Sequence, residues 1–268
     1  MNTPPASDWL INSSPHVQTE DSVRRIMLRV LIALLPAVGA ALWFFGWHAL
    51  RLTVACTVSC VLGEWAIRAL MKRDRGIDDL SAAVTGVLLA LNLPPQLPTW
   101  MAVLGSLVAI VIAKQIYGGI GYNLFNPALI GRTFLLVSFP VAMTTWLAPA
   151  AFPWTDAVTT ATPLGIWKTT LNATGQPPAD FFTQFSLTDL LVGNRPGCLG
   201  ETCSLALIAG ALYLLATRCI TWHIPGAMIL TVLVGATIFY KMDPTHNLPP
   251  HYHLLTGGLL LGALFMAT

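Results

Sequence analysis

The feature that most limits the fold is a series of long apolar stretches. A helix needs about 20 mainly apolar residues to cross a bilayer, and six stretches meet this requirement: 26–45, 49–70, 99–117, 128–146, 205–221 and 224–240. Only 10% of the 268 residues are charged, whereas a soluble domain has about 25%. We therefore expect an all-α integral membrane protein, which excludes a soluble enzyme, a disordered chain and a disulfide-rich secreted domain.

Two shorter apolar runs, 81–93 and 254–268, are rich in glycine, which is typical of broken or re-entrant helices that line a site. The sequence Thr-Gly-Val-Leu-Leu-Ala-Leu at 85–91 is echoed by Thr-Gly-Gly-Leu-Leu-Leu-Gly at 256–262. Two long spans precede each copy. This predicts a polytopic bundle of two inverted repeats of about five helices each, of which the second is truncated at Thr268.

The basic residues predict the orientation, because cytoplasmic loops carry an excess of Lys and Arg. With the N-terminus in the cytoplasm, ten of the 14 basic residues, Lys114 and Arg132 among them, fall on that side, and four fall outside. The resulting domains are a cytoplasmic segment (1–25), a first transmembrane repeat (26–146), an outer loop (147–203) and an incomplete second repeat (204–268). A loop as long as 147–203 is uncommon without a function.

That loop contains the sequence Asp-Ala-Val-Thr-Thr-Ala-Thr-Pro-Leu at 156–164. Residue types alone indicate a Ser/Thr turn or a helix cap in front of a proline. Such a cap is an ordinary structural role and implies no chemistry.

The same motif resembles the flavin-attachment site of the RnfD/NqrB family of membrane redox subunits. In that family, a dedicated flavin transferase esterifies the last threonine of Asp-x-x-Ser/Thr-x-Ala-Thr-Pro-Leu to the phosphate of FMN. The resemblance implies that Thr162 carries the FMN, that Asp156 is the acidic position, and that Thr159 and Ala161 are recognition positions. Thr160 stands where glycine is commoner, which departs from the family pattern.

Three other stretches resemble the same family, and the resemblance covers essentially the whole chain. They are Ser-Pro-His at 14–16, Asn-Pro-Ala-Leu-Ile-Gly-Arg at 126–132 and Gly-Cys-Leu-Gly-Glu-Thr-Cys at 197–203. The family has serine where Cys198 and Cys203 stand. These replacements argue against a disulfide or a metal site there, and we expect no metal elsewhere.

The resemblance implies a membrane subunit of the ion-translocating ferredoxin:NAD oxidoreductase (Rnf) complex, which carries electrons through covalent FMN. It places the chain in the bacterial inner membrane, with the flavin loop in the periplasm. The implied partners are the subunits RnfA, RnfB, RnfC, RnfE and RnfG, the lipid bilayer and the flavin transferase, without nucleic acid. A second, non-covalent flavin such as riboflavin and the choice of Na⁺ or H⁺ stay open.

Two alternative functions remain at this point. One is an NqrB-like subunit of a sodium-pumping NADH:quinone reductase, although the short N-terminus favours the RnfD branch. The other is a solute channel without a redox role, because the expected repeat architecture resembles urea channels.

Several charged residues have competing interpretations. Arg195 and Lys168 are the loop cations available to a flavin phosphate. Glu64 and Arg68 are spaced as an i,i+4 pair at the membrane interface, although an intramembrane carboxylate can also mark an ion path. Arg132 either extends to the cytoplasmic headgroups or has a functional role.

Overall fold

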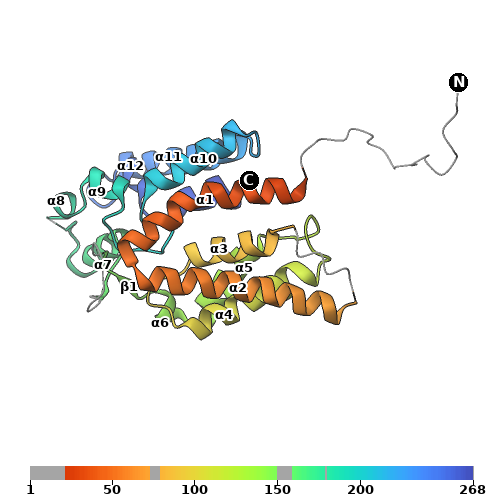
Figure 1. The fold of residues 1–268 in the computed structure, drawn as a ribbon. Helices are drawn as coiled ribbons and strands as arrows, with labels where there is room; N and C mark the ends of the chain where they lie inside the picture. Colours follow the sequence, from red (N-terminus) through yellow and green to blue (C-terminus); the bar gives the residue numbers. More distant parts are fainter. Residues whose placement is uncertain (1–21, 73–78, 150–158, 179, 268) are drawn as a thin grey trace, which may run out of the picture.

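The structure, a computed structural model, describes residues 22–72, 79–149, 159–178 and 180–267. Its helices and strands, shown in Figure 1, are α1 (Val23–Phe45), α2 (Trp47–Leu70), α3 (Ser81–Leu91), α4 (Thr99–Leu107), η2 (Val108–Gln115), α5 (Pro127–Ser138), α6 (Pro140–Met143), β1 (Trp146–Leu147), β2 (Thr159–Thr160), α7 (Pro163–Thr174), α8 (Phe181–Gln184), α9 (Leu187–Val192), α10 (Ser204–Ala216), α11 (His223–Met242), α12 (Pro250–Leu255), α13 (Leu259–Leu261) and η3 (Gly262–Met266).

Three of the described helices, α1, α2 and α11, are long and apolar enough to cross a membrane. Shorter apolar helices accompany them, and α4 continues directly into the π-helix η2. The only described strands, β1 and β2, have two residues each. The prediction of an all-α, multi-pass membrane protein is therefore confirmed, whereas the inverted relation between the two repeats stays a prediction.

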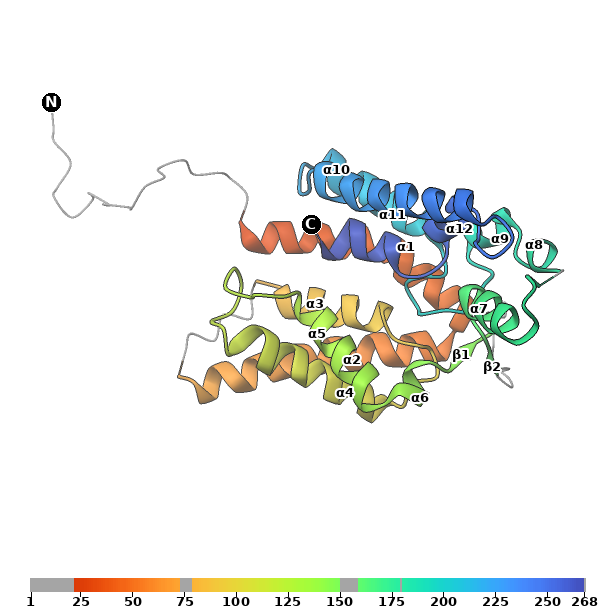
Figure 2. The same cartoon turned by 180° about the vertical axis from the view of Figure 1, so that it is seen from behind.

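The helices form two groups that pack through small residues. Figure 2 shows α10 and α11 on one side of α1, and α2 to α5 on the other. A Cβ added to Gly86 of α3 would lie 2.6 Å from Thr57 Cα of α2, and one on Gly210 of α10 would collide with the Ala33 carbonyl oxygen of α1. Glycine thus lets these backbones touch, as is common between membrane helices.

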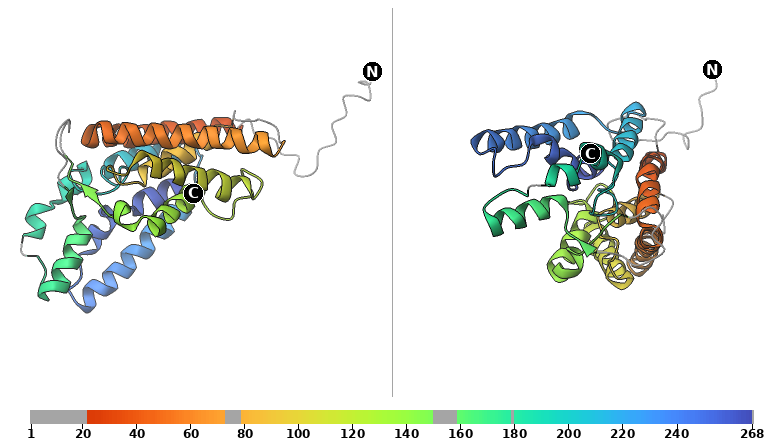
Figure 3. Two further views of the ribbon diagram at one scale, coloured as in Figure 1. Left: turned by 90° about the horizontal axis from the view of Figure 1, so that it is seen from below. Right: turned by 90° about the vertical axis from the view of Figure 1, so that its left-hand side faces the viewer.

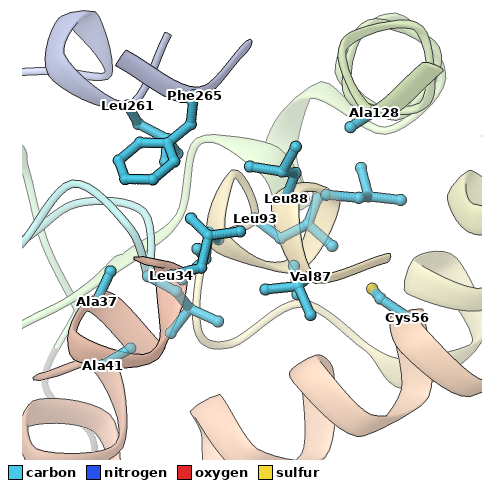
Figure 4. Packing of buried hydrophobic residues seen from close by; sticks show 14 of the residues in the cluster. Leu34, Ala37, Ala41, Cys56, Val87, Leu88, Leu93, Ala128, Leu261 and Phe265 are labelled. Atoms are coloured by element: carbon cyan, nitrogen blue, oxygen red, sulfur yellow. The ribbon is translucent and has the colours of Figure 1, made fainter. Parts of the chain in front are cut away.

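The short helix α3 lies in the centre of the molecule, where ten of its 11 residues are buried. The C-terminal segment formed by α13 and η3 reaches the same centre. Figure 4 shows Leu261 and Phe265 from that segment in one apolar cluster with Leu88 and Leu93. The two glycine-rich runs are therefore internal half-helices, as their sequences predicted.

The run 128–146 is not the single span that we expected. Helix α5 ends at Ser138, and Phe139 adopts a non-helical conformation (φ −134°, ψ 59°) in front of Pro140. Proline lacks the N–H that a helix interior needs, and it disfavours helical geometry in the residue before it. The chain therefore breaks at Pro140 and continues through α6 into β1.

The run 254–268 is divided, in agreement with the expected broken helix, whereas one further expected span is shortened. The run 254–268 breaks after α12, because Thr256 is extended and Gly257 has a positive φ of 82°. The expected span 205–221 ends at Ala216, and Arg218 lies in the left-handed region with φ 54°. With 13 residues, α10 is too short to cross a bilayer by itself.

The elements from β1 to α9 gather at the end of the bundle opposite the start of α1 (Figures 1 and 2). The placement of the loop 147–203 on one side of the membrane and of the N-terminus on the other stays a prediction. Figure 3 shows α11 extending away from the other helices, and only 6% of its most apolar window is buried.

Candidate functional site

Thr162 is the N-cap residue of α7. Its Oγ1 accepts a hydrogen bond from the backbone N–H of Gly165 at 3.1 Å, and Pro163 occupies the first helical position. The helix cap indicated by the residue types is therefore present. A helix N-terminus also presents unpaired N–H groups and a partial positive charge, which together favour an anion.

The rest of the threonine motif pairs with the short strand that follows α6. In the antiparallel ladder of β1 and β2, Thr160 lies opposite Trp146 and Thr159 lies opposite Leu147. Thr159, Thr160 and Ala161 are exposed. Asp156, the predicted acidic position, lies outside the described residues, as does the Ser-Pro-His element at 14–16. The ladder thus fixes the backbone that leads into Thr162.

Two cavities meet at Thr162. The first, here named the outer cavity, has a volume of about 460 Å³ and is lined by Thr144, Thr145, Trp146, Thr159, Thr160, Ala161, Thr162, Gly165 and Thr169. The second, the inner cavity, has a volume of about 150 Å³ and is lined by Arg132, Trp146, Thr162, Pro163, Leu164, Arg195, Pro196, Glu201, Thr256 and Gly257. Thr162 and Trp146 line both.

Two arginines and one glutamate supply the charges of the inner cavity. Arg132 Nη1 donates to Asn92 Oδ1 at 2.9 Å, and Arg132 Nη2 lies 3.9 Å from Glu201 Oε1. Arg195 is buried with 3% exposure, and its Nη2 donates to the backbone carbonyl of Glu201. Arg195 Nη1 is buried and has no hydrogen-bond partner among the described residues. Burial lowers the pKa of Arg195 to about 10, although the nearby Glu201 opposes this shift.

The structure answers two of the competing interpretations. Arg132 does not extend to cytoplasmic headgroups, because its side chain turns inward to Asn92 and to Glu201 of the outer loop. Of the two loop cations, Arg195 lines the inner cavity, whereas Lys168 is exposed on α7 and lines neither cavity.

Sequence reasoning did not identify Glu201 as part of the site. The segment around it docks onto the end of α3, where the N–H groups of Leu199 and Gly200 donate to the carbonyls of Leu93 (3.1 Å) and Leu91 (2.7 Å). A Cβ on Gly200 would lie 2.8 Å from Leu91 Cβ. The available signal in the sequence was Gly-Glu-Thr at 200–202. Glycine has no Cβ and so permits this close approach of two backbones, and the approach brings the neighbouring Glu201 to the site.

A second polar cluster lies at the other end of α3. Glu64 is completely buried, and its carboxylate contacts Lys114 Nζ at 2.7 Å, Gln115 Nε2 at 2.6 Å and Arg68 Nη2 at 3.1 Å. Lys114 Nζ also donates to Ser81 Oγ. The expected Glu64–Arg68 pair is confirmed, whereas the position of Glu64 at the membrane interface stays a prediction. Lys114 is likewise buried inside the bundle, because η2 carries it inward.

Comparison with known proteins gives matches over nearly the whole chain. A model of the NQR2, RnfD, RnfE family matches residues 10–268. The D subunit of the Na⁺-translocating ferredoxin:NAD⁺ oxidoreductase complex of Acetobacterium woodii is 44% identical over 96% of this chain and 76% of its own length. The D subunit of the proton-translocating ferredoxin:NAD⁺ oxidoreductase complex of Clostridium ljungdahlii is 43% identical over 97% and 78%, respectively.

A third relative is the D subunit of the ion-translocating oxidoreductase complex of Escherichia coli, which is 37% identical over 96% of this chain and 81% of its own length. Both the family match and each of these three relatives cover nearly all of the chain. The chain therefore belongs to the NQR2, RnfD, RnfE family.

Proposed function

We propose that this chain is a membrane subunit of an ion-translocating ferredoxin:NAD⁺ oxidoreductase complex and carries electrons through FMN esterified to Thr162. The names of its relatives support the complex. The observation that carries the flavin assignment is the position of Thr162, which caps a helix N-terminus and lines two adjoining cavities.

The residues around Thr162 fit this group. The outer cavity, at about 460 Å³, lies within the range of roughly 300–1,000 Å³ of small-molecule sites. The inner cavity, at about 150 Å³, is too small for a three-ring system, but it contains cationic side chains that suit a phosphate. Trp146 borders both cavities and offers an aromatic surface to a flat ring.

Bound FMN would supply reversible one-electron and two-electron transfer, which no side chain here can perform. The chain itself holds and orients the group. The Thr162 oxygen fixes its position, so that electron-transfer distances do not depend on a binding equilibrium. The N-terminus of α7 stabilises the negative charge of the ester.

The proposal includes partners. A subunit of such a complex needs its other subunits, which we expect to be RnfA, RnfB, RnfC, RnfE and RnfG, and a flavin transferase for maturation. We place the complex in the bacterial inner membrane with Thr162 on the periplasmic side. One relative is named for Na⁺ and another for protons, so we assign no coupling ion. The same names favour this proposal over a sodium-pumping quinone reductase or a solute channel.

The test is production of the chain with a flavin transferase, followed by intact-mass measurement and peptide mapping. Formation of the ester needs an activated donor such as flavin adenine dinucleotide. The Thr162 oxygen bonds to phosphorus, the P–O–P bond breaks, AMP leaves and the hydroxyl proton is released. We expect one FMN on the peptide that contains Thr162.

The matched variants separate chemistry from folding. Thr162→Asn removes the hydroxyl but keeps a side chain that caps helices at least as well as threonine, so we expect a folded protein without covalent FMN. Thr174→Ala, at the exposed far end of α7, should keep full FMN. A wild-type chain without FMN, or FMN retained in Thr162→Asn, would refute the assignment.

A further inference from the structure

The inner cavity is lined by more cationic than anionic groups. Its described ionisable groups are the guanidinium groups of Arg132 and Arg195 and the carboxylate of Glu201. Among the described residues that line the cavity, one positive charge therefore has no counter-charge, and Arg195 is the buried one of the two arginines. Burial of an uncompensated charge is unfavourable, because the charge loses its hydration without gaining a partner. A bound monoanion would remove this cost.

The two arginines differ in whether their N–H donors already have partners. Arg132 is engaged, because Nη1 donates to Asn92 and Nη2 faces Glu201. Arg195 is held in place through Nη2, which donates to the Glu201 carbonyl, while Nη1 stays buried and has no hydrogen-bond partner in the described part of the chain. Both Arg195 and Thr162 line the inner cavity. Arg195 thus has a fixed orientation and a buried donor without a partner among the described residues, and its side chain lines the cavity that Thr162 shares.

We propose that Arg195 binds the phosphodiester through which the flavin is joined to Thr162, and so fixes the orientation of the flavin. This inference rests on the proposed function. A phosphodiester carries one negative charge, which equals the excess charge of the cavity. Guanidinium groups bind phosphate oxygens through directed N–H donors, and the N-terminus of α7 approaches the same group from the Thr162 side. Arg195 is accordingly a positioning residue and takes no part in electron transfer.

The experiment compares four proteins: the wild type, Arg195→Met, Arg195→Lys and the control Lys168→Met. Each is purified as the full chain after production with and without flavin transferase. The control removes a charge from an exposed residue of α7 that lines neither cavity. Two quantities are measured: the initial rate of FMN attachment, by intact mass, and the rise in unfolding temperature that attachment causes.

We expect attachment to be about tenfold slower in Arg195→Met, as is typical for the loss of a hydrogen bond to a charged group, and to be partly restored in Arg195→Lys. Attachment of FMN should raise the unfolding temperature of the wild type and of Lys168→Met by the same amount. The rise should fall by more than half in Arg195→Met. Because each protein is compared with its own unmodified form, a purely structural effect of Arg195 cancels.

Two results would overturn the inference: the same temperature rise in Arg195→Met as in the wild type, or no better attachment in Arg195→Lys than in Arg195→Met. If Arg195→Met does not fold, Arg195→Gln takes its place, since glutamine keeps an N–H donor for the Glu201 carbonyl but has no charge. Absence of FMN from wild-type Thr162 would instead refute the proposed function, so the two failures are distinguishable.

Discussion

The two ends of α3 carry two buried polar clusters that differ in charge balance. At the N-terminal end, Glu64 and Asp79 face Arg68 and Lys114, so that two negative charges match two positive ones among the described residues. At the C-terminal end, Asn92 leads to the inner cavity, where the positive charge is in excess. In a cluster with balanced charges, the side chains satisfy one another and hold the helices together. A cluster with excess positive charge and an unpartnered donor can instead bind an anionic ligand.

The clusters also differ in how their residues reach the centre. Glu64 lies on the long helix α2, and Lys114 lies on the π-helix η2. Both elements lie in the first half of the chain. The inner cavity instead combines α5, the segments around Thr162 and Glu201, and the break at Thr256 and Gly257 near the end of the chain. A site at the junction of several segments can accommodate a group that no single segment encloses.

The largest effect should come from breaking the balanced cluster. Glu64→Leu leaves Lys114, which is 1% exposed, without its carboxylate. We expect a loss of about 3–5 kcal/mol in the free energy of unfolding, because a buried charge is left unpaired. Chemical denaturation in detergent measures this loss.

The double variant Glu64→Leu/Lys114→Met provides the control for that prediction. It removes both charges, so it should recover most of the lost stability. A double variant as unstable as Glu64→Leu would show that side-chain packing, rather than charge balance, determines the stability at this end of α3.

A smaller effect is expected at the other cluster from Arg132→Met. This change removes the hydrogen bond to Asn92 and leaves the Glu201 carboxylate without its guanidinium partner. We expect a loss of about 1–3 kcal/mol in unfolding free energy, because the Arg132 side chain is 30% exposed and water can replace part of the contact. Stability equal to the wild type in the same denaturation experiment would contradict the inward role of Arg132.

The smallest effect should come from Arg68→Met. The Arg68 side chain is 16% exposed, and Glu64 keeps its contacts with Lys114 and Gln115 when Arg68 is removed. We expect less than about 1 kcal/mol, as for other partly solvated ion pairs. A loss as large as that of Glu64→Leu would show that Arg68, and not Lys114, is the main counter-charge.

Much of the fold could be predicted because it depends on local sequence. Apolar runs predicted α1, α2 and α11, and glycine-rich runs predicted the internal segments that include α3. The break at Pro140 was also visible as a proline, but the apolar residues around it favoured one continuous span. For the site, the residue types around Thr162 predicted the cap, and the family resemblance singled out the same residue.

The remaining residues of the site could not be predicted, because they depend on which helix faces meet. Lys114 and Glu64 are 50 positions apart, and the count of basic residues assigned Lys114 only to the cytoplasmic side, without a partner. Arg132 and Glu201 also come from distant segments. Nothing in the local pattern around any of these residues states which partner faces it.

Local sequence was enough to predict that the chain crosses a membrane and which of its apolar runs are short and rich in glycine, because hydrophobicity and backbone preference act over a few residues. Which charges face one another became visible only from the packing of the helices. Arg195 looks like an ordinary loop cation in the sequence, and it becomes a buried guanidinium beside Thr162 when the outer loop docks onto α3. Charge compensation is a property of three-dimensional neighbours, so no local reading of the chain contains it.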